Sequence, residues 1–126
     1  DLVLNGHDHT YARGHIPIKT TDNNESSNFN TLYITSVSGP KQYKIGLEQI
    51  KNYQLDGYVN DKLGEQTQFF QVISINEETL TYKAYTVLGD EYDTAIIKKD
   101  FSSGIKTLRW YHVKQMKVYL VCNLKS

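Results

Sequence analysis

Residues 69–98 contain three strand-like runs, FFQVISI, TLTYKAYTV and YDTAIIK. The short segments NEE and LGDE separate them. Runs of β-branched and aromatic residues divided by such turn residues are typical of consecutive antiparallel hairpins. In the middle run Leu80, Tyr82 and Ala84 share one face, with the period of two that a half-buried strand requires. We therefore predict an antiparallel meander and a β-rich fold.

The rest of the chain is less regular. DLVLNG at residues 1–6 predicts the end of a buried strand that runs into a glycine turn, and we expect coding sequence upstream of it. A polar loop is expected at residues 7–15, a surface loop at 20–30 and a buried strand, TLYITSV, at 31–37. Residues 41–68 have an apolar spacing that predicts a short helix, although glycines interrupt it.

Composition excludes several classes of protein. The chain has 126 residues, which is enough for one hydrophobic core. Its 14 basic and 14 acidic residues cancel, so no single-sign field favours a nucleic acid or an anionic membrane as a partner. No apolar run approaches the roughly 18 residues of a membrane span. The single cysteine, Cys122, excludes an internal disulfide and a cysteine-rich zinc module.

Two histidines stand two residues apart in the string Gly6-His7-Asp8-His9, directly after the first predicted strand. Alternate residues of an extended segment point to the same side, so both imidazoles can face one site at the strand's carboxyl edge. Neutral imidazole is a good ligand for zinc, iron and manganese, and a pair of such metals activates a bridging water for phosphoryl displacement. The alternative interpretation is two surface loop histidines without a ligand role.

The longer string GHDHTYAR at residues 6–13 resembles the last conserved block of the purple acid phosphatases, a branch of the calcineurin-like metallophosphoesterases. The resemblance implies a dinuclear centre of iron, zinc or manganese, in which His7 ligates the divalent metal and His9 the iron-type site. It also implies hydrolysis of phosphomonoesters or phosphodiesters by a metal-activated hydroxide. Tyr11 matches the family's string without being a ligand, and Ala12 replaces a glutamate common there, which suggests a divergent bacterial-type branch.

The resemblance further implies a fold and a domain division. Residues 1–100 are interpreted as the carboxy-terminal part of a metallophosphoesterase domain, and residues 101–126 as an unassigned tail. The expected fold is β-rich (α+β), the carboxy-terminal half of an αββα sandwich with mostly antiparallel strands and little helix. The family's other ligand blocks do not occur in this chain, so we expect weak or no metal binding and no catalysis by the chain alone. The resemblance slightly favours a periplasmic or secreted location.

Arg13, His15 and His112 have competing interpretations. Arg13 is either a contact to a phosphate oxygen, whose geometry a guanidinium matches, or a structural ion-pair former. His15 either lines the phosphate pocket or is a solvated loop histidine, and the second interpretation is favoured. Residues 107–123, which include Trp110, fit either a strand or a helix. His112 within them is interpreted as a packing residue.

A function from a different class is compatible with the same pattern. Half of a sandwich exposes an apolar sheet face and unpaired strand edges, which favour association. The chain would then be a non-catalytic β-sheet interaction module that forms a homodimer. A phosphate-ester substrate is expected only for the complete enzyme.

Overall fold

The computed structural model of the chain describes residues 1–18 and 29–111. Strands predominate in these ranges. The elements follow one another as β1 (Leu2–Asn5), β2 (Tyr11–Pro17), β3 (Phe29–Thr35), α1 (Leu47–Leu55), β4 (Val59–Gly64), β5 (Phe69–Asn76), β6 (Thr79–Thr86), β7 (Glu91–Lys99) and β8 (Lys106–Tyr111). The prediction of a β-rich fold with little helix is confirmed. Within the described ranges no helix has the length and apolar character needed to cross a membrane.

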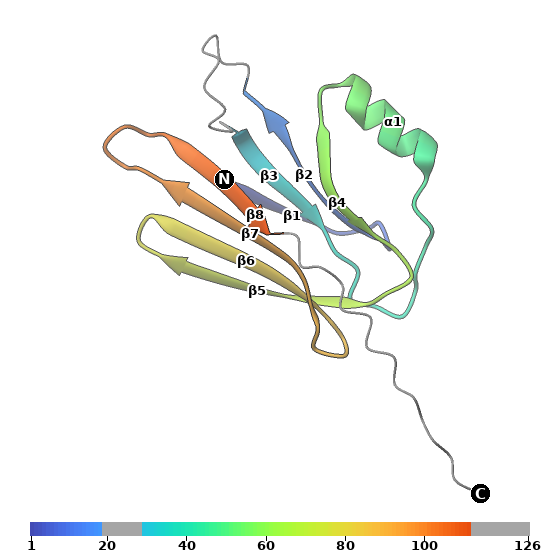
Figure 1. Cartoon of the computed structure of the whole chain (residues 1–126). Helices are drawn as coiled ribbons and strands as arrows, with labels where there is room; N and C mark the ends of the chain where they lie inside the picture. Colours follow the sequence, from blue (N-terminus) through green and yellow to red (C-terminus); the bar gives the residue numbers. More distant parts are fainter. Residues whose placement is uncertain (19–28, 112–126) are drawn as a thin grey trace, which may run out of the picture.

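The strands form two four-stranded sheets (Figure 1). The first has the order β1-β3-β2-β4, with β1 parallel to β3 and the other neighbours antiparallel. The second has the order β5-β6-β7-β8 and is antiparallel throughout. Figure 1 shows the sheets as two layers, with α1 on the side of the first sheet that faces away from the second. The architecture is therefore a β-sandwich with a helix on one outer face.

Side chains from both sheets fill the space between them. The buried apolar residues come from β2 and β3 on one side and from all four strands of the second sheet on the other. At the centre, the Tyr11 ring lies 5.0 Å from the ring of Phe69 and 5.3 Å from that of Tyr92, measured between centroids. Tilted ring contacts of this kind add to the free energy of apolar burial. The aromatic cluster therefore joins β2 to the second sheet.

The meander predicted for residues 69–98 is confirmed as β5, β6 and β7. Tyr82 and Ala84 are fully buried on the predicted face. Gly89, in the turn before β7, has a φ of 91°, which glycine adopts without strain. β8 adds a fourth strand from within the segment interpreted as an unassigned tail, and it places Trp110 in a strand and not in a helix.

The loop predicted at residues 7–15 is confirmed only for residues 7–10, because β2 begins at Tyr11. The side chains of Tyr11, Arg13 and His15 alternate along β2 and are all buried. Their period of two is that of a strand. Two of the three buried side chains are polar, however, so a search for apolar alternation does not find the strand.

The first strand and the region at residues 41–68 also differ in part from expectation. β1 lies at the edge of its sheet with Val3 and Leu4 exposed, so it is not the buried strand that its apolar sequence predicts. The strand predicted at residues 31–37 is confirmed as β3. Residues 41–68 contain the expected short helix, α1, and also β4, whose sequence VNDKLG lacks apolar alternation.

A close approach between β2 and β4 requires glycine at position 14. A Cβ atom there would overlap the carbonyl oxygen of Val59 and the ring of Tyr58. The register of the two strands also shifts at this point by one residue of β4, which is a β-bulge at Asp61. The bulge and the glycine together let the two strands pair while Tyr58 lies across β2.

We expect Gly14→Ala to lower the free energy of unfolding by about 1–3 kcal/mol, because the added methyl group must displace backbone or an aromatic ring. Chemical denaturation followed by circular dichroism measures this change. Gly39→Ala is the matched control, since no atom lies within 4 Å of a Cβ built at that position. Its effect is expected to stay within about 0.5 kcal/mol. Equal effects of the two substitutions would contradict the close approach.

Candidate functional site

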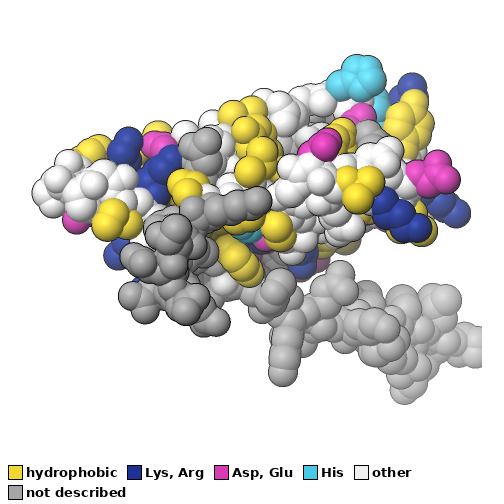
Figure 2. All heavy atoms as spheres, turned by 90° about the horizontal axis from the view of Figure 1, so that it is seen from above, with side chains coloured by type: hydrophobic (Ala, Val, Ile, Leu, Met, Phe, Trp, Pro, Cys, Tyr) yellow, Lys and Arg dark blue, Asp and Glu magenta, His cyan; other side chains and the backbone are white. Residues whose placement is uncertain are grey.

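The two histidines of the GHDH string lie in the turn that joins β1 to β2. His7 has a positive φ of 79°, and its side chain is 98% exposed. Its Nδ1 lies 3.5 Å from Oδ1 of Asp8. His9 is only partly exposed. Figure 2 shows histidine side chains at one end of the molecule, with basic and acidic groups interspersed over the same face. The turn therefore presents its imidazoles at the surface.

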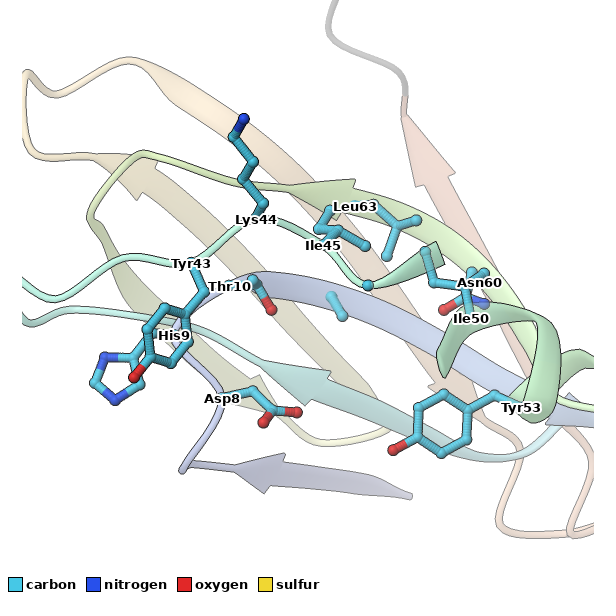
Figure 3. Close-up of a pocket in the computed structure, with 12 residues that line it drawn as sticks. Asp8, His9, Thr10, Tyr43, Lys44, Ile45, Ile50, Tyr53, Asn60 and Leu63 are labelled. Atoms are coloured by element: carbon cyan, nitrogen blue, oxygen red, sulfur yellow. The ribbon is translucent and has the colours of Figure 1, made fainter. Parts of the chain in front are cut away.

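The hydrogen bond of His9 decides which ring nitrogen is available to a ligand. Nδ1 lies 2.8 Å from the carbonyl oxygen of Lys41, and a carbonyl oxygen only accepts, so Nδ1 carries the donated proton. In the neutral imidazole Nε2 then keeps its lone pair. Metal-binding histidines in proteins almost always have this arrangement. The Tyr43 ring, with its centroid 5.0 Å away, packs against the imidazole (Figure 3).

Two imidazoles do not make a complete metal site. Across residues 1–18 and 29–111, no group of three or more histidine, cysteine, aspartate and glutamate side chains is arranged to hold a metal ion. The structure thus places His7 and His9 in one turn without bringing a third ligand to them. Chemically, this turn can donate imidazole nitrogen to a metal whose other ligands come from outside the turn.

Arg13, a candidate substrate contact, is held in a buried ion-pair network between the sheets. Its Nε and Nη2 donate to Asp93 at 2.7 and 3.1 Å, and its Nη1 donates to Asp61 at 3.1 Å. The side chains of Arg13, Asp61 and Asp93 are 1%, 3% and 1% exposed. Almost no surface of the guanidinium is left for a phosphate, so the structure places Arg13 as an ion-pair former.

His15, the second candidate substrate contact, belongs to the same network. It lies in β2 and is 7% exposed, so the expectation of a solvated loop histidine is wrong. Its Nδ1 lies 2.9 Å from Oδ2 of Asp61, and its ring packs against Phe29 and Trp110. These contacts place the imidazole inside the sandwich. His112 lies outside the described residues.

Tyr11 and Tyr82 extend the network through their hydroxyl groups. Tyr11 donates to Asp93 at 2.7 Å, and its oxygen lies 3.3 Å from that of Tyr82. Burial, and then the neighbouring Tyr82 and Asp93, raise the pKa of Tyr11 far above its usual range. Burial opposes the charge on Arg13, but the hydrogen bond to Asp93 and the nearby carboxylates outweigh it and raise the pKa of Arg13. The tyrosine therefore stays neutral and the arginine stays charged.

The sequence did not reveal Asp61 and Asp93 as partners of Arg13. They lie 48 and 80 residues away along the chain, and no local pattern links them. For Asp93 alone the sequence indicates a buried partner, because this residue occupies a strand position within the predicted meander. A charged residue that faces the core of a sheet needs a partner of opposite charge.

Two adjoining cavities are bordered by α1 and by strands of the first sheet, one of about 400 Å³ and one of about 110 Å³. We call them together the α1 groove. Asp8, Thr10, Ala12, Tyr53 and Asn60 line both cavities. Figure 3 shows the Asp8 carboxylate and the Tyr53 hydroxyl pointing toward one another from different elements. The groove is not predicted from the sequence, because no local pattern brings Tyr33 of β3 together with Tyr53 of α1 and with Tyr58.

Comparisons of the chain with known protein families, with curated proteins and with solved structures found no match. A function must therefore be argued from the histidine turn, from the α1 groove and from the resemblance of residues 6–13. The geometry favours a ligand role for His9 and a structural role for Arg13 and His15.

We expect Asp93→Ala to lower the free energy of unfolding by about 3–5 kcal/mol, because Arg13 stays buried while it loses its bidentate partner. Lys83→Ala is the control, since it removes the half-exposed pair between Lys83 and Glu91 and should cause no measurable change. Urea denaturation of the two variants provides the comparison. An Asp93→Ala variant as stable as Lys83→Ala would show that the network does not hold the sheets together.

Proposed function

We propose that the chain supplies two imidazole ligands, His7 and His9, to the metal centre of a phosphoesterase. The observation that carries the proposal is the hydrogen bond from His9 Nδ1 to the Lys41 carbonyl oxygen, which leaves Nε2 as the ligand atom. His7, two residues earlier, exposes almost its whole side chain. Neutral imidazoles suit zinc, iron and manganese.

The reaction class comes from the string GHDHTYAR at residues 6–13, which resembles the last ligand block of the purple acid phosphatases. His7 and His9 would hold metal of this kind, and the chemistry it would supply there is an activated water for hydrolysis of a phosphate ester. In this proposal two residues of the chain hold the metal. His9 would bind it through Nε2, with the ring fixed by the hydrogen bond to Lys41, and His7 would bind it from the exposed side of the turn. The substrates are phosphomonoesters or phosphodiesters.

A complete metal centre requires further ligands, and the free edge of β1 indicates where the polypeptide that supplies them would pair. β1 is an edge strand parallel to β3, and its residues Val3 and Leu4 are 37% and 55% exposed. A strand paired with the free edge of β1 would extend the first sheet past the histidine turn and bury apolar surface. Ligand sites in α/β sheets lie at the carboxyl ends of such parallel strands. We assign the missing ligands to that added polypeptide, as in an αββα sandwich.

We expect the purified chain to bind Zn²⁺ weakly through His7 and His9. Isothermal titration calorimetry of the chain and of the double variant His7→Ala/His9→Ala measures this, and the double variant should lose the heat of binding. His112→Ala is the control, because it also removes an imidazole but leaves the turn intact. Zn²⁺ binding that is equal in all three proteins would contradict the ligand role.

Phosphate binding separates a phosphoesterase centre from an incidental metal site. In the presence of Mn²⁺, the unaltered chain should broaden the ³¹P signal of inorganic phosphate more than the double variant does at the same metal concentration. Hydrolysis of p-nitrophenyl phosphate by the chain alone is not expected. Metal binding that leaves the phosphate signal equal in both proteins would count against the phosphoesterase assignment.

A second candidate function is a β-sheet interaction module that forms a homodimer. The observation that favours it is β5, an edge strand whose sequence FFQVISIN contains no charged residue. Val72, Ile73 and Ile75 are exposed, with Ile73 and Ile75 on one face of the strand and Val72 on the other. Two copies of β5 paired antiparallel about a twofold axis would continue the sheet and bury these side chains.

For this second candidate we expect sedimentation velocity to show a fraction of dimer that increases with protein concentration. Ile75→Lys should shift the equilibrium to monomer, since an edge lysine opposes strand pairing. Leu88→Lys is the matched control, because Leu88 is also exposed but lies in the turn between β6 and β7. A chain that stays monomeric at every concentration would remove this candidate.

A further inference from the structure

The α1 groove contains polar and aromatic groups besides the His9 imidazole of the histidine turn. The described residues around its larger cavity, of about 400 Å³, include the carboxylates of Asp8 and Asp56 but no lysine, arginine or histidine. This volume suits a small organic molecule. Carboxylates accept hydrogen bonds and repel anions, so the cavity does not suit a phosphate group.

Three tyrosine rings form a continuous part of the cavity wall. The ring of Tyr58 lies 6.2 Å from that of Tyr33 and 5.9 Å from that of Tyr53, with the planes tilted by 62° and 59°. Tyr58 lies against Gly14, where a larger side chain would displace its ring. Aromatic faces held in this way bind the C–H face of a sugar ring or an organic cation.

Asn60 adds a hydrogen-bond donor without an acceptor. Its Nδ2 is buried and makes no hydrogen bond within the described part of the chain, and the residue lines both cavities of the groove. A buried polar group in this condition costs stability. A ligand oxygen in the groove would remove that cost if the Asn60 side chain turned its Nδ2 toward it.

We propose that the α1 groove binds a neutral sugar ring. Sugar hydroxyl groups donate to Asp8 and Asp56 and accept from Asn60, while the C–H face of the ring stacks on a tyrosine. A tetraalkylammonium cation would satisfy the carboxylates and the rings but offers no acceptor to Asn60. A phosphate offers acceptors but is repelled by the carboxylates. Among these three ligand classes, only the sugar matches all the groups.

The position of the groove connects this site to the histidine turn, and here the inference rests on the proposed function. The smaller cavity is lined by His9 as well as by Asp8 and Asn60, so a sugar in the groove lies beside the proposed metal ligands. The substrate class is then a phosphate ester whose alcohol part is a sugar. Binding of the sugar alone requires no metal, which makes its test independent of the phosphoesterase test.

Saturation-transfer difference NMR on the full chain, with EDTA present, tests the site. The probes are the methyl pyranosides of glucose, galactose and mannose, with tetramethylammonium chloride as the organic cation. We expect saturable transfer to at least one pyranoside, strongest at the C–H protons of one ring face, and none to tetramethylammonium. Transfer to tetramethylammonium alone, or to no probe, would overturn the proposal.

Three variants locate the binding. Tyr53→Ala should weaken the affinity for the bound pyranoside about tenfold through loss of a stacked ring. Asn60→Leu should weaken it similarly yet keep or raise the thermal midpoint of the free protein, because an unsatisfied amide is replaced by an apolar side chain. Tyr85→Ala is the matched control, since Tyr85 stacks on Phe70 in the other sheet. Affinity unchanged in Tyr53→Ala and Asn60→Leu would place the sugar elsewhere and refute the site.

Discussion

The buried charge of Arg13 is the constraint on which the two-sheet arrangement depends. A guanidinium taken out of water costs several kcal/mol unless carboxylates meet it with good geometry. Asp93 in β7 and Asp61 in β4 provide them, one from each sheet. If one sheet slid over the other, Arg13 would separate from Asp93. Asp93 would stay buried without its cation, and Arg13 would keep only Asp61. The network therefore selects one alignment of the sheets, whereas apolar contacts alone would tolerate several.

The same network anchors the turn that carries the histidines. Tyr11 and Arg13 stand at the start of β2 and both bind Asp93, so the chain is fixed immediately after His9. The string at residues 6–13 thus divides into two physical parts. Its first half presents imidazoles at the surface, and its second half fastens that turn to the sandwich. A tyrosine and an arginine can therefore accompany the histidines at fixed offsets without touching a metal.

The sequence predicted those parts of the fold that local patterns determine. The meander at residues 69–98 and the short helix follow from period and spacing, and the paired histidines are visible as a string. β2 and β4 were not predicted, because their inward side chains include Arg13, His15 and Asp61, and polar residues imitate a loop. Their burial becomes favourable only through contacts 46 to 80 residues apart, which no window of the sequence contains.

The α1 groove lies on the outer face of the first sheet, outside the core, so residues there can bind a ligand without disturbing the packing between the sheets. Tyr11 and Tyr82 pack in the core, whereas Tyr33 and Tyr58 line the α1 groove on the opposite side of β2 and β3. Strand preference does not distinguish Tyr33 from Tyr11 and Tyr82, since both faces of a sheet favour the residue, and Tyr58 lies just before β4. The difference lies in their surroundings: in the core Tyr11 donates to Asp93 and lies beside the Tyr82 hydroxyl, while the groove tyrosines stand beside Asn60, whose Nδ2 has no hydrogen-bond partner within the described part of the chain. Polar groups of a stable core are satisfied within the chain, so an unsatisfied one beside aromatic rings indicates a ligand from outside it.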